Sequence, residues 1–244
     1  MLTTNMVYAN KPGMVHYQVP FIQIIKDLVK TYEGSHRQCQ SFDRYVIDML
    51  AKGDTIVDIG THSLSYLYNL NKAVGKKGNL FLFETDAKRY TQLNRLQKLL
   101  ALKNTSILKA GCLQNNTAAI IPLNDYNSQN SPYVEADHTL DDICKRFNIQ
   151  PAFIRTNTPG NNDQILNGAV QLIKTCQPII ITRCDERAIG RDKVLGIFKF
   201  FNALNYRGFF MLDIIKLPLQ NFDFNLYQNT CSNFYCDQFV FEPF

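Results

Sequence analysis

A short stretch, IVDIGTHSLSY at residues 56–66, holds residue types suited to binding a ligand. Its first five residues form an apolar run ending in Asp58 and Gly60, which is typical of a buried parallel strand entering a tight turn. Glu84 ends the next apolar run, NLFLFE. The interval between Gly60 and Glu84 is close to the roughly 20 residues at which an acidic side chain binds a ribose. The pattern predicts a ribose-binding site shared by two strand ends.

The glycines of this turn restrict which ligand fits. A dinucleotide fingerprint requires three glycines, for the turn, for the pyrophosphate and for helix packing. Here only Gly60 is present, and Leu64 and Tyr66 follow it. A ligand without phosphate, such as S-adenosylmethionine, needs less room and still offers a ribose to Glu84. The alternative is that Asp58 and Glu84 are polar strand-end residues that bind nothing.

The elements around this turn alternate between strand and helix. Apolar patterns predict strands at 55–60, 79–84, 106–110, 152–156, 178–184, 208–213 and 238–243. They predict helices at 21–32, 41–51, 63–74, 86–102, 139–147, 162–175 and 188–205, with Asp86 and Thr139 as N-caps. Such alternation indicates an α/β fold with a doubly wound, mostly parallel sheet. We expect one domain, with 1–52 as an N-terminal helical segment packed on the sheet that 53–244 contains.

Several segments in order resemble a known family. These are VDIGTHSLSY, FLFETD, TLDDIC (139–144), AFIRTNTPGNNDQILNGAVQLIKTCQPIIITR (152–183), RGFFMLD and FVFEP. Together they resemble the FkbM family of S-adenosylmethionine-dependent methyltransferases, over most of residues 41–243. The resemblance implies a Rossmann-like methyltransferase domain with seven strands and an antiparallel last strand. It also implies S-adenosylmethionine as cofactor and O-methylation of a sugar or small-molecule hydroxyl.

The resemblance also implies two groups of site residues. The residues expected to bind the cofactor are Asp58, Gly60, Thr61, His62, Glu84 and Gly111. The residues expected beside the acceptor, as catalytic candidates, are Asn157, Asn162 and Arg183. His62 either contacts the ligand and acts as a base near neutral pH, or caps a helix or faces solvent.

Departures from the family pattern leave two functions open. The family's second glycine is Leu64 here, and its I-D-V-E-G-A-E segment aligns with residues 156–162, which lack all three carboxylates. Arg183 stands where the family commonly has an acid, and Asp163 compensates for one loss only by a shift of one residue. Asparagine can hydrogen-bond but cannot act as a general base. The chain is either an active methyltransferase that relies on substrate alignment, or a catalytically inactive relative that binds a protein partner.

Other polar and aromatic residues allow two interpretations each. Arg155 and Arg183 lie at the ends of neighbouring strands, and either face an anionic acceptor or are solvated strand-end charges. The aromatic residues of the 218–237 connection either line a pocket or pack as core and lid; they are Phe222, Phe224, Tyr227, Phe234 and Tyr235. This connection and the polar stretch 113–137 are the expected surfaces for a protein partner.

Composition excludes some classes of function. The formal net charge is +5, but Lys and Arg are scattered without a dense run, so we expect no nucleic-acid partner. Seven cysteines without a CxxC pair predict reduced thiols and no metal site. No apolar run of about 18 residues occurs, so no membrane span is expected. The N-terminus lacks a secretory pattern, which favours the cytoplasm. The expected partner is a small-molecule or glycan acceptor, or a protein if the chain is inactive.

Overall fold

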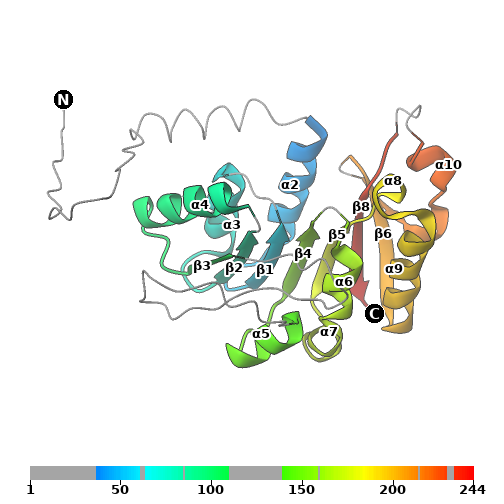
Figure 1. The fold of residues 1–244 in the computed structure, drawn as a ribbon. Helices are drawn as coiled ribbons and strands as arrows, with labels where there is room; N and C mark the ends of the chain where they lie inside the picture. Colours follow the sequence, from blue (N-terminus) through cyan, green and yellow to red (C-terminus); the bar gives the residue numbers. More distant parts are fainter. Residues whose placement is uncertain are drawn as a thin grey trace, which may run out of the picture.

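A single mixed sheet organises the protein (Figure 1). The computed structural model describes residues 37–60, 64–84, 86–109, 139–158, 160–213, 215–229 and 234–244; of these, the side chains of 37–41, 64, 65 and 109 are not described. The sheet has the strand order β3-β2-β1-β4-β5-β8-β6-β7. The strands are β1 (Thr55–Gly60), β2 (Asn79–Glu84), β3 (Thr105–Lys109), β4 (Phe153–Asn157), β5 (Ile179–Arg183), β6 (Tyr206–Leu212), β7 (Ile215–Pro218) and β8 (Gln238–Pro243).

Strand direction confirms the predicted fold class. β1 pairs in parallel with β2 and β4, and β3 and β5 extend these pairs outward. β8, the last strand of the chain, is antiparallel to both β5 and β6, as the resemblance implied. The sheet has one strand more than the seven expected, because β7 forms an antiparallel hairpin with β6 at the edge. β7 falls between the predicted strands 208–213 and 238–243, where the sequence predicted no further strand.

Helices cover both faces of the sheet. They are α2 (Arg37–Met49), α3 (Leu64–Val74), α4 (Ala87–Leu99), α5 (Leu140–Arg146), α6 (Asn162–Asn167), α7 (Val170–Cys176), α8 (Glu186–Ile189), α9 (Arg191–Ala203) and α10 (Phe224–Tyr227), with a short 3-10 helix η1 (Leu219–Asn221). One core cluster joins α2, α3 and α4 to one face of the sheet. A second core cluster joins α5, α6, α7 and α9 to the other face. This is the doubly wound arrangement that the alternating pattern predicted.

Local capping explains where several elements begin. Asp86 caps α4 by accepting a hydrogen bond from the backbone N–H of Arg89 at 2.7 Å, as predicted. Thr139 and Asp142 form a capping box at the start of α5. The single helix predicted at 162–175 is wrong, because α6 ends at Asn167 with Gly168 as its C-cap, and α7 begins at Val170. The Asp141 carboxylate accepts from the backbone N–H groups of residues 171 and 172, and this caps α7 from another helix.

The helix predicted at 188–205 is also divided. Gly190, with φ of +85°, separates α8 from α9. A left-handed conformation of this kind favours glycine and ends a helix. The helix predicted at 21–32 lies outside the described residues. α2 buries Phe42 and Val46 against the same core as α3, while the domain boundary at residue 52 stays a prediction.

The aromatic connection after β7 mostly serves packing. The Phe222 ring lies 5.0 Å from that of Phe239, and the Tyr227 ring lies 4.7 Å from that of Phe210. Phe224 also joins the partly buried shell of this core. Phe234 and Tyr235 do not belong to this core: Phe234 is 54% exposed, and the Arg187 guanidinium lies 4.2 Å above the Tyr235 ring. Within the described ranges, no helix combines the length and apolarity that crossing a bilayer requires.

Candidate functional site

The turn after β1 lies where the strand order reverses. From β1 the chain proceeds to β2 and β3 on one side, while β4 and β5 extend the sheet on the other. Ligands of open α/β sheets bind at the carboxyl ends of the strands at this point. Gly60 ends β1 and is paired with Asn157, the last residue of β4. The two predicted site residues are therefore neighbours at the switch point.

Gly60 is required by the backbone itself. Its φ is +126°, and a Cβ atom added there would lie 2.5 Å from the carbonyl oxygen of Asn157. No side chain fits at that distance without moving the β4 backbone. Gly60 therefore has a structural reason to be glycine whether or not a ligand binds.

Glu84 ends β2 beside Gly60. The parallel register pairs Ile59 with Phe83, so the next residues of the two strands, Gly60 and Glu84, lie side by side. Glu84 is fully buried, and its Oε1 accepts a hydrogen bond from the backbone N–H of Asp86 at 3.0 Å. A carboxylate at this position has the chemistry to accept hydrogen bonds from the two ribose hydroxyls.

Three predicted cofactor residues are not placed. Thr61, His62 and Gly111 lie outside the described residues, as does the side chain of Leu64. Their proposed roles stay predictions.

Asp58 belongs to a buried ion cluster. It is paired across the sheet with Arg155, and its Oδ2 lies 3.6 Å from Nη1 of that residue. Nη2 of Arg155 lies 3.4 Å from Oδ1 of Asp43 on α2, and the guanidinium stacks 4.6 Å above the ring of Tyr66 on α3. One guanidinium thus ties two strands to two helices next to the Gly60 turn. We name these four residues, Asp43, Asp58, Tyr66 and Arg155, the Arg155 cluster.

The Arg155 cluster corrects the predicted position of Arg155 and includes two residues, Asp43 and Tyr66, that the sequence did not single out. Arg155 lies in the middle of β4 and is 4% exposed, so it is neither at a strand end nor solvated. Sequence reasoning missed Asp43 and Tyr66. Because side chains alternate along a strand, Arg155 lies on the same face of β4 as Phe153, and α2 covers that face. The alternation in the sequence was therefore a signal that a polar residue of a covering helix would pair with Arg155.

Burial controls the titration of the Arg155 cluster. It raises the pKa of Asp43 to about 6; the Arg155 guanidinium opposes this shift and Asp58 adds to it. Burial also raises the pKa of Tyr66 well above its usual value, and a hydrogen bond with Asp58 contributes. Low-dielectric surroundings disfavour the charged form of both groups.

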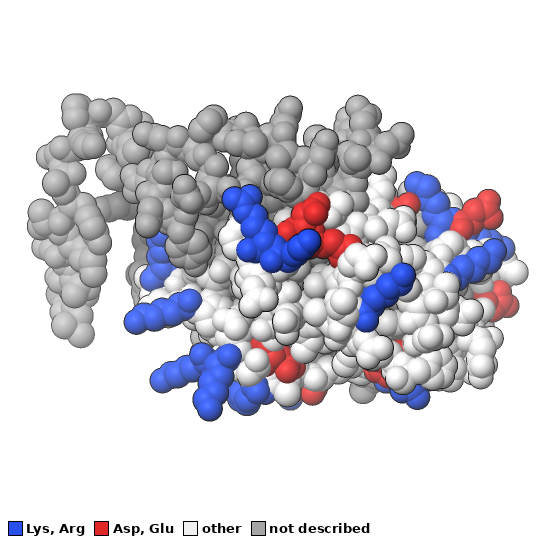
Figure 2. Space-filling view, turned by 90° about the horizontal axis from the view of Figure 1, so that it is seen from below, with Lys and Arg blue, Asp and Glu red and all other residues white. Residues whose placement is uncertain are grey.

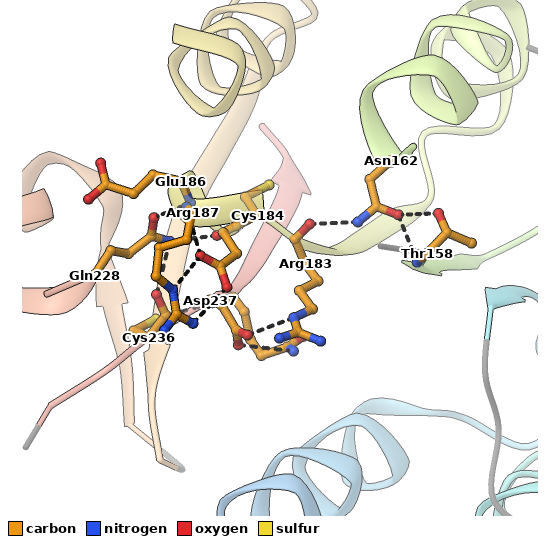
Figure 3. A network of polar contacts seen from close by, with 11 residues as sticks. Thr158, Asn162, Arg183, Cys184, Glu186, Arg187, Gln228, Cys236 and Asp237 are labelled. Carbon is orange, nitrogen blue, oxygen red and sulfur yellow. Dashed lines mark hydrogen bonds and ion pairs between the residues drawn. The ribbon is translucent and has the colours of Figure 1, made fainter. Parts of the chain in front are cut away.

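Asn162 holds the loop after β4 in place (Figure 3). Its Oδ1 accepts from the backbone N–H of Thr158 at 3.0 Å and from the Thr158 hydroxyl at 2.7 Å. Its Nδ2 donates to the carbonyl oxygen of Arg183 at 2.6 Å. Asn162 is 4% exposed. The expected acceptor residue thus connects the ends of β4 and β5 through both of its polar atoms.

Arg183 lies beside Asn162, but its charge faces elsewhere. Its Nε donates to Asp237, just before β8, at 2.6 Å. The side chain of Arg183 is 40% exposed, so this ion pair reaches solvent. Figure 3 shows the guanidinium pointing away from Asn162 toward the Asp237 carboxylate.

A buried glutamine fastens the loops beyond β5. Gln228 Nε2 donates to the carbonyl oxygens of Cys184 and Cys236, at 2.5 and 3.1 Å. Its Oε1 accepts from the backbone N–H of Glu186 at 2.7 Å. Figure 3 shows these contacts joining three segments at the carboxyl edge. Sequence reasoning did not single out Gln228.

Metal ligation has no basis in the described part of the chain. No group of three or more His, Cys, Asp or Glu residues is close enough there to hold one ion. Four described cysteines, at 144, 176, 184 and 236, are free thiols.

Comparison with known proteins gives structural matches alone. No family model matches the chain, and no similar curated protein is found. The methyltransferase FkbM from Methylobacillus flagellatus KT has a TM-score of 0.55 at 14% identity; the match covers 88% of this chain and 50% of that one. A Clostridium thermocellum protein described as an rRNA methylase has a TM-score of 0.53 at 16% identity, covering 85% and 96%.

A third match includes a ligand in its description. The O-methyltransferase from Bacillus cereus, in complex with SAH, has a TM-score of 0.50 at 12% identity, and the match covers 92% of each chain. Identities this low show a shared fold alone, so membership of the FkbM family stays a prediction. The chain has the Rossmann-like fold of the methyltransferases to which it is similar.

Proposed function

We propose that this protein is an S-adenosylmethionine-dependent methyltransferase acting on a hydroxyl of a sugar or small molecule. The observation that carries the proposal is that Gly60 and Glu84 end the neighbouring strands β1 and β2 at the switch point of the fold. The Bacillus cereus neighbour, crystallised with SAH, supports the choice of cofactor. When bound, the cofactor supplies an electrophilic methyl group.

The chain's own residues fit the ribose half of that cofactor. We assign the ribose hydroxyls to Glu84 and the close backbone approach to Gly60. The roles of Thr61, His62 and Gly111 in cofactor binding are part of the same proposal. Asp58 contributes through Arg155, by holding β1 and β4 together at the turn. Asn157, half-buried next to Gly60, is the candidate for orienting the acceptor.

Catalysis in this proposal depends on positioning. Asn162 and Arg183 act by shaping the loop after β4 and the end of β5. Asn162 binds Thr158 and the Arg183 carbonyl, and the Arg183 side chain binds Asp237. Methyl transfer to a well-placed hydroxyl gains most from alignment of the two reacting atoms. We propose the cytoplasm as the location, where the free thiols stay reduced.

One observation favours the non-catalytic alternative. Asn162 and Asp58, both expected in the site, are buried and engaged in contacts within the protein. In this alternative the fold persists as a binding module for a protein partner, and the 218–237 connection is the proposed contact surface.

Cofactor titration by calorimetry tests the proposal, with Glu84→Gln as the variant. A glutamine keeps the acceptor for the Asp86 N–H but loses the charge, which costs about 1.5–3 kcal/mol for hydrogen bonds to a charged group. We expect Kd for S-adenosylmethionine and S-adenosylhomocysteine to rise by about ten- to a hundredfold. Glu242→Gln, at the opposite edge, is the control. Absence of binding by the wild type up to millimolar cofactor would exclude the enzyme and favour the module.

A further inference from the structure

Exposed cations gather at the amino edge of the sheet, the end opposite Gly60 and Glu84. Along the sequence they are dispersed between residues 52 and 207. β1 to β6 all run in one direction, so the turns that precede them meet at one edge (Figure 1). The fold thereby brings together charges that the sequence separates.

The first half of the edge is formed by β3, β2 and β1. Lys103 lies just before β3, Lys76 and Lys77 lie in the turn before β2, and Lys52 lies before β1; all four are exposed. Lys52 Nζ donates to the carbonyl oxygen of Lys72 at 2.6 Å, which holds it beside the end of α3. Figure 2 views this edge, and its blue side chains are most numerous on the side where Figure 1 places α3 and α4.

The row continues across the second half. Lys145 and Arg146 end α5 before β4, Lys174 lies in the last turn of α7 before β5, and Arg207 begins β6; all are exposed. Strands in a sheet are about 4.8 Å apart, so six intervals from β3 to β6 span about 29 Å. We name this row the amino-edge row.

Helix dipoles account for only part of the amino-edge row. Lys145, Arg146 and Lys174 lie in last turns, where the helix backbone favours cations. Lys77 and Lys103 lie in turns outside the helices, so a helix dipole does not explain why cations occur at these two positions.

Two acidic residues, Asp54 and Glu242, lie at strand ends along the row. Asp54 accepts a hydrogen bond from the backbone N–H of Ala51 at 2.8 Å. Glu242 pairs with Lys216 at 2.6 Å. Glu242 also lies opposite Arg207 in the register of β6 and β8, so these two carboxylates offset part of the row's charge and leave the cations in excess.

Two exposed aromatic rings interrupt the row. Phe147, directly after α5, is 45% exposed, and Phe244, at the end of the chain after β8, is 82% exposed. Each has an arginine of the row above its ring: Arg146 at 5.6 Å and Arg207 at 5.6 Å from the ring centroid. Exposed rings interleaved with cations are what proteins use to stack unpaired bases and bind phosphates.

We propose that the amino-edge row binds single-stranded nucleic acid, with the cations on phosphates and with Phe147 and Phe244 stacked on bases. This goes beyond the proposed methyl transfer, because the row lies at the far end of the strands from Gly60. It revises the expectation of no nucleic-acid partner, which rested on spacing along the chain. An anionic membrane would also attract the cations, but it gives the two rings no stacking partner.

Fluorescence anisotropy with a labelled oligouridine of about 12 nucleotides tests the proposal. The test variant combines Lys76→Glu, Lys77→Glu and Lys103→Glu. The matched control, Lys88→Glu with Arg89→Glu and Lys193→Glu, makes the same charge change at the start of α4 and of α9, away from the amino edge. A thermal melt of each variant verifies folding, and Phe147→Ala tests stacking without changing charge.

We expect the wild type to bind at about 50 mM salt and to weaken steeply with added salt. The test variant should lose at least about tenfold in affinity, and its log–log salt slope should shrink by about 2, since each single-strand phosphate contact contributes about 0.7. Phe147→Ala should weaken binding at least about threefold. No binding by the wild type, equal losses in test and control variants, or tighter binding to vesicles rich in phosphatidylserine would each overturn the proposal.

Discussion

Replacing Asp43 with Asn tests the electrostatics of the Arg155 cluster. The change preserves side-chain size and removes one negative charge from a group that also contains Asp58, Tyr66 and Arg155. Burial raises the pKa of Asp43 from its ordinary 3.8 to about 6, in spite of the attraction of Arg155. Desolvation therefore outweighs ion pairing at this carboxyl, and the wild type should become less stable as Asp43 ionises.

The magnitude follows from the size of this shift. A difference of about 2 pKa units corresponds to about 3 kcal/mol. Because the folded pKa of Asp43 exceeds the unfolded value, its contribution to stability is fully present below about pH 4 and is lost as pH rises through 6. Asn undergoes no such loss. The free energy of unfolding of Asp43→Asn minus that of the wild type should rise by up to about 3 kcal/mol between pH 4 and pH 7.

Urea denaturation of both proteins across this pH range measures the difference in their free energies of unfolding. Groups that titrate in the same way in both proteins do not contribute to this difference. Asp48→Asn is the control, since it removes the same charge from α2 where the side chain is 59% exposed and pairs with Arg44. A difference curve for Asp43→Asn that is flat, or that falls with pH, would refute the reasoning. A fall would mean that pairing with Arg155 outweighs burial.

Gly60→Ala should lower the free energy of unfolding by about 3 kcal/mol or more, because φ is positive there and the added Cβ would clash with β4. Gly196→Ala, in an open part of α9, is the control and should be neutral or stabilising by up to about 1 kcal/mol. Urea denaturation midpoints of the two variants and the wild type test both expectations. Asn162→Asp restores a carboxylate in the loop but cannot donate to the Arg183 carbonyl, so thermal melts at pH 7 should show a loss of about 2 kcal/mol. A melt as high as the wild type's would contradict this role. Burial raises the pKa of the Cys236 thiol to about 12, so iodoacetamide at pH 8 should modify it only after unfolding; mass spectrometry detects the adduct, and rapid labelling of folded protein would contradict the predicted burial.

The strands were predictable because burial on both faces gives continuous apolar runs. Glu84 and Pro243 end β2 and β8 as the sequence indicated. Helix ends were less predictable where a distant residue decides them. Asp141, on α5, caps α7 through the N–H groups of residues 171 and 172, and periodicity within 162–175 contains no sign of that contact.

Of the candidate site, the placement of Gly60 and Glu84 at neighbouring strand ends was predictable, while their role in cofactor binding stays a prediction. Glu84 and Gly60 are adjacent as their spacing suggested. The partners of Arg155 and Asn162 were not predictable, because they depend on which helix covers which face. Asp43 and Arg155 are 112 residues apart in sequence and meet only because α2 packs on the same face of β4.

The glycine at position 60 has an evolutionary consequence. The β4 backbone occupies the space a side chain would need there, so selection for folding alone would retain this glycine in a lineage that had abandoned methyl transfer. Glu84 has a similar safeguard in its bond to the start of α4. Such a lineage would keep Gly60 and Glu84 while residues at other positions of the candidate site were free to change. Conservation of Gly60 and Glu84 among homologues would therefore indicate a shared fold. Only conservation or loss of the other site residues would indicate whether the homologues still transfer methyl groups.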